Sequence, residues 1–293
     1  MQKYTRKQFD QQFPDDDACL DWLRHNLYPE RIECPSCTKT NKFHRVKSRK
    51  VYECDYCGYQ ISPTAGTILH KSSTSLRSWF HAVFLMSTTR TGISAKQLER
   101  EIGVTYKTAW RMFTLIRKLM AEDGVSIWGQ IEADETYVGG KRPGKRGRGA
   151  AGKTIVQGIL ERQGKIVAKV VPDVKAETLL PNIKEYVMPE STIFTDEMTS
   201  YNGLGQAGYS HRRVHHAAKV YVTDGDTHTN TIDGFWSLTK RGIDGVHHQV
   251  SHKYLQAYFD AYTFRWNHRD DETPMFVSLL NRIPQSGADG TLS

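Results

Sequence analysis

The spacing of apolar residues divides the chain into a helical N-terminal part and a C-terminal part with several strands. Between residues 76 and 121 apolar residues recur every three or four positions without a proline, which is typical of amphipathic helices. Residues 126–217 instead contain short runs of alternating polar and apolar residues, which are typical of half-buried strands. A chain of 293 residues is also long enough for two or three domains.

Two of the predicted helices form a candidate helix-turn-helix. Ser94 is placed to cap the first helix, and Gly103 to end it. The second helix begins after Thr105 and carries an apolar stripe from Ala109 to Met120. A plain helical hairpin has the same pattern, so both interpretations stay open. In the helix-turn-helix interpretation the residues that face DNA are Thr105, Tyr106, Lys107, Thr108 and Arg111.

The C-terminal part predicts five strands and several helices in a defined order. Strands are expected over 126–140, 154–162, 164–173, 191–196 and 211–217, with helices over 176–187, after 196, around 230–242 and over 251–272. The first three strands would form an antiparallel meander, and the fourth would pair parallel to the first. This is the order that an RNase H-like fold needs.

Three aspartates lie at related places in this order. Asp134 lies on the first strand, on the same face as Glu132, and Asp196 ends the fourth strand. A helix after the fifth strand would bring Asp233 to them. Each acid taken singly also fits a solvated residue or a helix cap. Together, three carboxylates repel each other unless cations bind between them, and hard oxygen ligands select Mg²⁺ or Mn²⁺. Two such ions about 4 Å apart favour in-line attack on a phosphodiester.

Four of the five cysteines have the spacing of a structural metal site. Cys34 and Cys37 form one Cys-x₂-Cys pair, and Cys54 and Cys57 form another after sixteen residues. Two such turns complete a tetrahedral Zn²⁺ site, and the alternation over 38–53 predicts the short strands of a zinc ribbon. Two disulfides are the alternative interpretation. The ion would hold together a unit too small to bury its own core.

The net charge of +8 favours a polyanionic partner, of which nucleic acid is the leading candidate. A glycine-rich basic segment, 139–153, should be a flexible loop between the first two strands of the predicted sheet. Such a loop can wrap a phosphate backbone or simply be solvated. Its candidate DNA-binding residues are Lys141, Arg142, Lys145, Arg146 and Arg148.

Neither a membrane span nor a signal peptide is predicted. No apolar run approaches the roughly 20 residues that a membrane helix needs, and the N-terminus has no apolar targeting stretch. We therefore expect a cytoplasmic protein without a membrane partner.

These segments together resemble the DDE-type transposases of bacterial insertion sequences, in the group that begins with a zinc ribbon and is related to eukaryotic Merlin elements. The likeness runs from residue 15 to residue 283, through the motifs CPSC…CDYC, EADETYVGGK, FTDEMTSYNGL and HTNTIDGFWSLTKRG. It implies that Asp134, Asp196 and Asp233 are catalytic acids that bind two Mg²⁺ or Mn²⁺ ions. It also implies a catalytic Lys240, seven positions after Asp233.

The resemblance implies an enzyme that binds the inverted-repeat ends of a mobile element and catalyses metal-dependent DNA cleavage and strand transfer. Double-stranded DNA would be its partner, with a homodimer or larger assembly on DNA and a nucleoid location when bound. This chain departs from the group at Asp233, where Glu or Asn is typical. Because Asp is one methylene shorter, its helix must approach the metals more closely.

Two other functions stay open: a DNA-binding regulator without catalysis, and an RNase H-like nuclease or resolvase. We predict an α+β chain of five parts. They are an N-terminal helical segment (1–30), a zinc ribbon (31–70), a helix-turn-helix region (71–123), an RNase H-like catalytic domain with a mixed five-stranded sheet (124–285) and a disordered tail (286–293).

Overall fold

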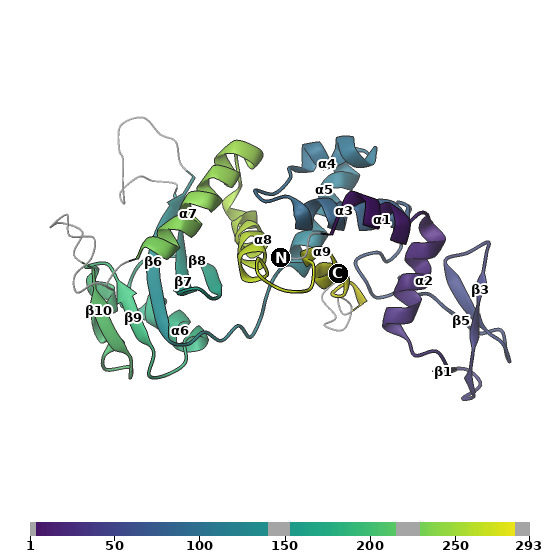
Figure 1. Ribbon diagram of the computed structural model, residues 1–293, viewed down its shortest axis with the longest axis horizontal. Coiled ribbons are helices and arrows are strands. Elements are labelled where there is room, and N and C mark those ends of the chain that lie inside the picture. Colours follow the sequence, from purple (N-terminus) through teal and green to yellow (C-terminus); the bar gives the residue numbers. More distant parts are fainter. Residues whose placement is uncertain (1–3, 140–152, 215–228, 285–293) are drawn as a thin grey trace. The chain divides into compact units, whose positions relative to one another are not determined.

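The computed structural model describes residues 4–139, 153–214 and 229–284 and divides into two compact units (Figure 1). Unit 1 contains the residues up to Leu119 and those from Asp271 onward, and unit 2 is Met120–Asp270. The C-terminal end of the predicted 124–285 domain thus groups with unit 1, because helix α9 (Met275–Leu280) packs against α3 (Leu76–Thr88). The ring centroid of Phe276 lies 5.8 Å from that of Phe9 and 5.7 Å from that of Phe84, so this contact is aromatic.

Unit 1 begins with two helices and a set of short antiparallel strands. The helices are α1 (Arg6–Gln12) and α2 (Asp16–Leu27), and the strands are β1 (Ile32–Glu33), β2 (Thr40–Asn41), β3 (Phe43–Val46), β4 (Val51–Cys54) and β5 (Gln60–Ile61). β1 pairs with β2, and β3, β4 and β5 form a three-stranded sheet. Only a few apolar side chains of these strands are buried, among them Phe43, Tyr52 and Ile61. A patch this small gives little stability by itself, which is why the predicted metal matters.

The helices predicted for the helix-turn-helix region are present as α3, α4 (Ala95–Ile102) and α5 (Tyr106–Leu119). The Ser94 hydroxyl accepts a hydrogen bond from the Gln97 backbone N–H at 3.1 Å, as a helix cap does. Gly103 ends α4 in the left-handed region at φ +72°, a conformation that glycine adopts without steric cost. Along α5, Ala109, Phe113 and Ile116 are buried as the periodicity predicts.

Unit 2 is built on a mixed five-stranded sheet. Its strands are β6 (Gln130–Val138), β7 (Thr154–Glu161), β8 (Ile166–Val171), β9 (Thr192–Thr195) and β10 (Ser210–Arg213). Their spatial order is β10-β9-β6-β7-β8. β6, β7 and β8 are antiparallel neighbours, whereas β9 runs parallel to β6 and β10 parallel to β9. This order confirms the predicted RNase H-like fold.

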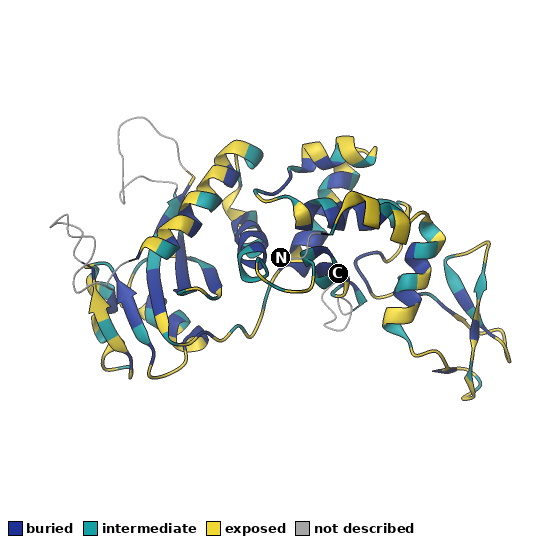
Figure 2. Cartoon of the chain, viewed as in Figure 1, coloured by how far each residue is buried: buried dark blue, intermediate teal, exposed yellow. Residues whose placement is uncertain are grey.

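Helices cover both faces of the sheet. On one face α6 (Ala176–Tyr186) and the 3₁₀ helix η1 (Thr199–Leu204) pack onto the strands, with Leu179, Ile183 and Tyr201 buried. On the other face lie α7 (Asn230–Gly242) and α8 (Leu255–Asn267), with Phe235 and Phe259 buried. The single turns η3 (Ile243–His247) and η4 (His252–Tyr254) connect them. Strands β6, β7 and β9 are largely buried, whereas the edge strand β10 is exposed (Figure 2).

The helix predicted after the fourth strand is only the 3₁₀ helix η1, a shorter element than the sequence favoured. No helix within the described ranges is long and apolar enough to cross a bilayer.

Candidate active site and zinc centre

The first two predicted acids lie level on neighbouring strands. Glu132 of β6 pairs with Phe194 of β9 in a parallel register. Two residues further along each strand, this register brings Asp134 beside Asp196, which directly follows β9. Asp196 Oδ1 accepts a hydrogen bond from the Met198 backbone N–H at 2.9 Å, which fixes the turn after the strand.

Helix α7 brings the third acid, Asp233, to strand β6. In its first turn, the Ile232 backbone N–H donates to Glu132 Oε2 at 2.9 Å. One turn later, Trp236 Nε1 donates to Asp134 Oδ2, also at 2.9 Å. Because both bonds join α7 to β6, they bring Asp233, which lies between the two donors, to the strand that carries Asp134.

The electrostatics of Asp134 report the convergence of the three acids. Burial, with the negative charges of Asp196 and Asp233 as a smaller cause, raises the pKa of its carboxyl to about 6, against the hydrogen bonds from Trp236 and the Glu135 backbone. A half-buried carboxylate with two anionic neighbours gains strongly from a divalent cation, and oxygen donors are the ligands that Mg²⁺ and Mn²⁺ prefer. The donor set therefore fits such an ion. Among the described residues, only the four ribbon cysteines bring three or more potential donor atoms within 4.8 Å of one another. The three aspartates stand farther apart than that.

Lys240 lies near the end of α7, two helical turns after Asp233. Both side chains are exposed. Residues seven positions apart lie on nearly the same side of a helix, so Lys240 and Asp233 face solvent together.

Trp236 combines two roles, core packing and a hydrogen bond to Asp134. Its side chain is 3% exposed and belongs to the core cluster of α7 and α8. It reaches Asp134 across Gly158, the residue that pairs with Asp134 on β7. A Cβ at position 158 would lie 2.5 Å from the Trp236 ring, so only glycine leaves room for the indole.

A buried ion pair beside the acids was not foreseen. Glu132 is fully buried, and its Oε1 lies 2.9 Å from Arg162 Nε. The only sequence signal was the position of Glu132 on the same face of the strand as Asp134. Its partner Arg162 lies thirty residues away, and local patterns do not identify such pairs.

The predicted zinc ligands form one cluster. The four sulfur atoms lie within 4.8 Å of one another, with Cys34 Sγ 3.5 Å from Cys57 Sγ and Cys37 Sγ 4.0 Å from Cys54 Sγ. Zn–S bonds of about 2.3 Å in a tetrahedron place sulfur atoms about 3.8 Å apart. A disulfide needs roughly 2.05 Å. The cluster therefore fits Zn²⁺ and not two disulfides.

The two cysteine turns have the same backbone conformation. The Thr38 N–H donates to the Cys34 carbonyl at 2.9 Å, and the Gly58 N–H donates to the Cys54 carbonyl at 3.1 Å. Thr38 (φ +57°) and Gly58 (φ +72°) both adopt the left-handed conformation that closes such a turn. Burial acts to raise the pKa of the Cys34 thiol, but hydrogen bonds from the backbone of Cys37 and Ser36 outweigh it and lower the pKa to about 7. Against the hydrogen bond from the Lys39 backbone, burial and the other three cysteine sulfurs raise the pKa of Cys37 to about 11, so Cys34 is the thiol of this pair that ionises more readily.

The predicted DNA-facing residues lie at the accessible start of α5. Thr105, Tyr106, Lys107 and Arg111 are exposed, and Thr108 is half-buried. Tyr106 stacks on Trp110 at a centroid distance of 6.4 Å, so the exposed start of the helix carries an aromatic pair.

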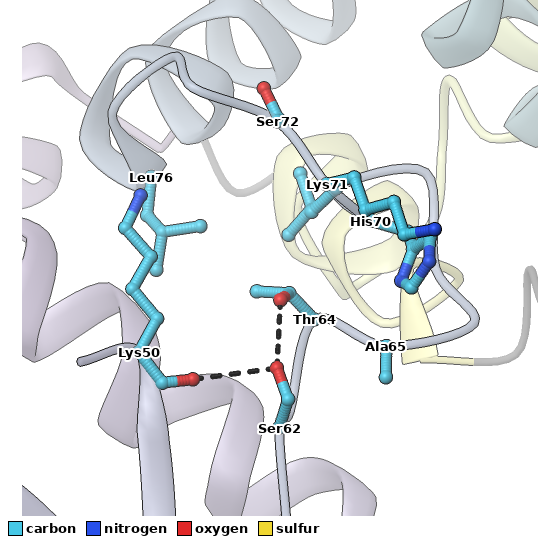
Figure 3. Close-up of a pocket in the computed structure, with 9 residues that line it drawn as sticks. Lys50, Ser62, Thr64, Ala65, His70, Lys71, Ser72 and Leu76 are labelled. Carbon is cyan, nitrogen blue, oxygen red and sulfur yellow. Dashed lines mark hydrogen bonds between the residues drawn. The ribbon is translucent and has the colours of Figure 1, made fainter.

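Two pockets of unit 1 adjoin the segment between the ribbon and α3. The pocket in Figure 3 has a volume of about 300 Å³, with Lys50 on one side and His70 and Lys71 on the other. A second pocket of about 380 Å³ shares His70 and adds Arg111 from α5. Neither lining includes a carboxylate. The residues that line the second pocket are Thr67, Ile68, His70, Trp110, Arg111, Thr114, Leu115 and Lys118. The residues that line the pocket in Figure 3 are Lys50, Ser62, Thr64, Ala65, Leu69, His70, Lys71, Ser72 and Leu76.

Residues 140–152 of the predicted basic loop lie outside the described residues. This applies to Lys141, Arg142, Lys145, Arg146 and Arg148.

Comparison with known proteins gives two family matches. Residues 126–267 match the model of the ISXO2-like transposase domain, and residues 14–60 match that of the transposase zinc-ribbon domain. The chain is 28% identical over 257 residues to an uncharacterized protein in transposable element ISH50 of Halobacterium salinarum, covering 80% of this chain and 85% of that protein. It is 31% identical over 119 residues to an uncharacterized transposase-like protein of Haemophilus influenzae, covering 41% of this chain and 93% of the relative.

Among solved structures, the Mos1 mariner paired-end complex with Mn aligns with a TM-score of 0.28 at 13% identity. The alignment covers 73% of this chain and 78% of that chain.

Proposed function

Because this chain belongs to the ISXO2-like family of DNA transposases, we propose that Asp134, Asp196 and Asp233 form its metal-dependent site for cutting and joining DNA. The observation that carries the proposal is the convergence of β6, β9 and α7 on the half-buried carboxyl of Asp134. The acids come from three separate elements, yet the charges of the other two act on this one carboxyl.

In this site the three aspartates would hold Mg²⁺ or Mn²⁺, which when bound supplies positive charge at the scissile phosphodiester and lowers the pKa of an attacking water. The charges of Asp196 and Asp233 both act on Asp134, and the Trp236 indole N–H donates to one of its oxygens. Lys240 is exposed on the same helix as Asp233 and would hold a DNA phosphate near the cut. The element's 3′-hydroxyl, freed by the first cut, would then attack a phosphodiester of target DNA at the same acids, joining to its phosphorus while the target's own 3′-oxygen leaves as a hydroxyl.

DNA recognition is assigned to unit 1. The exposed start of α5 would enter a groove through Lys107 and Arg111, and the two pockets around His70 would receive backbone phosphates. Their cationic linings, which contain no carboxylate, support this assignment. The basic loop around Arg146 would add phosphate contacts. Because two element ends are joined in one reaction, we propose a homodimer or larger assembly on DNA.

A cleavage and joining assay with DNA that carries the element's ends tests the proposal. With Mn²⁺ the native protein should yield cut and joined products, and Asp134→Ala and Asp196→Ala should yield neither. Glu177→Ala is the matched control, since this exposed acid lies on α6, which covers the opposite face of the sheet. Full joining by either aspartate variant would overturn the assignment. Cut DNA without joined molecules would indicate a nuclease, and binding without cutting would indicate a regulator.

A further inference from the structure

The buried pair Glu132–Arg162 contacts every element that carries a proposed catalytic acid. Glu132 lies on β6, two residues before Asp134. Its Oε2 accepts from the backbone N–H of Ile232, the residue before Asp233 on α7, at 2.9 Å. Its Oε1 lies 2.9 Å from Arg162 Nε, so each oxygen already has a partner.

Arg162 extends these contacts to the third element. Its guanidinium carbon lies 4.0 Å from the ring centroid of Phe194, which precedes Asp196 by two residues on β9. Its Nη1 also donates to Gln130 Oε1 at 3.0 Å, and its backbone N–H to the Gln130 carbonyl at 2.9 Å. The side chain of Arg162 is 9% exposed and that of Glu132 is fully buried, so water scarcely screens the pair.

We propose that Glu132 and Arg162 are positioning residues that hold β6, β9 and α7 together and so set the spacing of the three aspartates. The inference rests on the proposed function, and it assigns Glu132 no role as a metal ligand. Each aspartate lies only one or two residues beyond a contact of this pair. A displacement of α7 would therefore move Asp233 away from Asp134 almost directly.

The pair also accounts for the short third acid. The resemblance implies Glu or Asn at this position, and Asp233 is one methylene shorter than Glu, so α7 must approach β6 more closely than a glutamate would require. The direct hydrogen bond from Ile232 to Glu132 provides that approach, because backbone and carboxylate oxygen are in contact without an intervening side chain or water.

The test replaces the whole pair, since removing one partner would leave an uncompensated buried charge that can prevent folding. In Glu132→Leu/Arg162→Met both charges are absent, and apolar pairs of similar volume often maintain stability. Mn²⁺ binding to the zinc-loaded chain is measured by electron paramagnetic resonance of the free ion, together with strand joining. The variant should fold, bind Mn²⁺ about 10- to 100-fold more weakly, and join DNA only at raised Mn²⁺.

The matched control is Glu122→Leu/His268→Met. This pair is also largely buried, with a 2.8 Å contact in the same unit. It lies at the end of α8 that contacts β8, two strands away from β6. This variant should bind Mn²⁺ like the native protein.

Adding Asp233→Glu to the Glu132→Leu/Arg162→Met variant should recover part of the Mn²⁺ affinity, because the longer side chain spans a wider gap. Unchanged Mn²⁺ binding in the folded pair variant would overturn the proposal, as would a loss that Asp233→Glu does not reduce. If the pair variant does not fold, Mn²⁺ binding is measured on Arg162→Lys instead. This variant keeps the positive charge but loses the planar stacking of the guanidinium on the Phe194 ring. A folded Arg162→Lys chain with native Mn²⁺ affinity would equally overturn it. A native chain that neither binds Mn²⁺ nor joins DNA would refute the proposed function instead.

Discussion

Asp134→Asn should stabilise the metal-free protein while abolishing its activity. Asn keeps the shape of the side chain and an oxygen that accepts from Trp236 Nε1, but it carries no charge. In the native chain burial and the neighbouring acids raise the pKa of Asp134 from its ordinary value of 3.8 to about 6. Each pKa unit corresponds to about 1.36 kcal/mol, so ionised Asp134 destabilises the metal-free fold by about 3 kcal/mol.

The sign of the pH dependence follows from the same pKa. Because the folded chain retains a proton that the unfolded chain releases between pH 4 and pH 6, native stability falls as the pH rises through this interval. The advantage of Asp134→Asn should be small at pH 4 and reach about 3 kcal/mol above pH 7. For a unit of this size that corresponds to a rise in Tm of about 6–12 °C.

Differential scanning calorimetry of zinc-loaded, Mn²⁺-free protein at pH 4.5 and pH 8 measures this difference. The transition of unit 2 is the one that added Mn²⁺ shifts in the native chain. Mn²⁺ should raise the native Tm and leave that of Asp134→Asn nearly unchanged. A variant that is no more stable than the native chain at pH 8, or equally stabilised at both pH values, would refute the reasoning.

Four further predictions concern single residues. Trp236→Phe removes the indole N–H that donates to Asp134 Oδ2 and should lower the rate of joining about 10-fold without weakening DNA binding in a gel-shift assay. Gly158→Ala places a methyl group 2.5 Å from the Trp236 ring and should lower the free energy of unfolding by about 1–3 kcal/mol in urea titrations. Cys37→Ser should abolish stoichiometric zinc in atomic absorption measurements and weaken DNA binding, because three ligands do not complete the ribbon site. Arg111→Gln should weaken DNA binding and reduce the slope of log affinity against log salt by about one if Arg111 contacts a phosphate, whereas a loss confined to some sequences would indicate base contact.

Much of the architecture followed from local sequence patterns. The cysteine spacing predicted the metal cluster because a Cys-x₂-Cys turn brings both sulfurs to one side whatever surrounds it. Ser94 and Gly103 marked the ends of α4 because capping depends on residues within a single turn. The order of strands and helices restricted the sheet topology to one that juxtaposes Asp134 and Asp196, since parallel neighbours share a register.

Only the tertiary structure decided what surrounds the acids. The bonds that bring α7 to β6 join residues about a hundred positions apart: Ile232 to Glu132, and Trp236 to Asp134. Periodicity reports which face of an element is buried, but not which distant side chain meets it there. The need for glycine at position 158, opposite Asp134, is visible only in the structure, where the Trp236 indole occupies the space of a side chain.

The same distinction holds for charge and for the end of the chain. The sequence by itself determined that Asp134 lies on a half-buried strand, whereas its raised pKa depends on neighbours from β9 and α7 that fold onto it. The sequence pattern included residues 275–280 in the predicted catalytic domain, whereas packing of α9 against Phe9 and Phe84 places them in unit 1. Local hydrogen bonding and spacing thus set the elements and their order. Long-range packing, which depends on side-chain shape and burial, set the surroundings of the proposed catalytic acids.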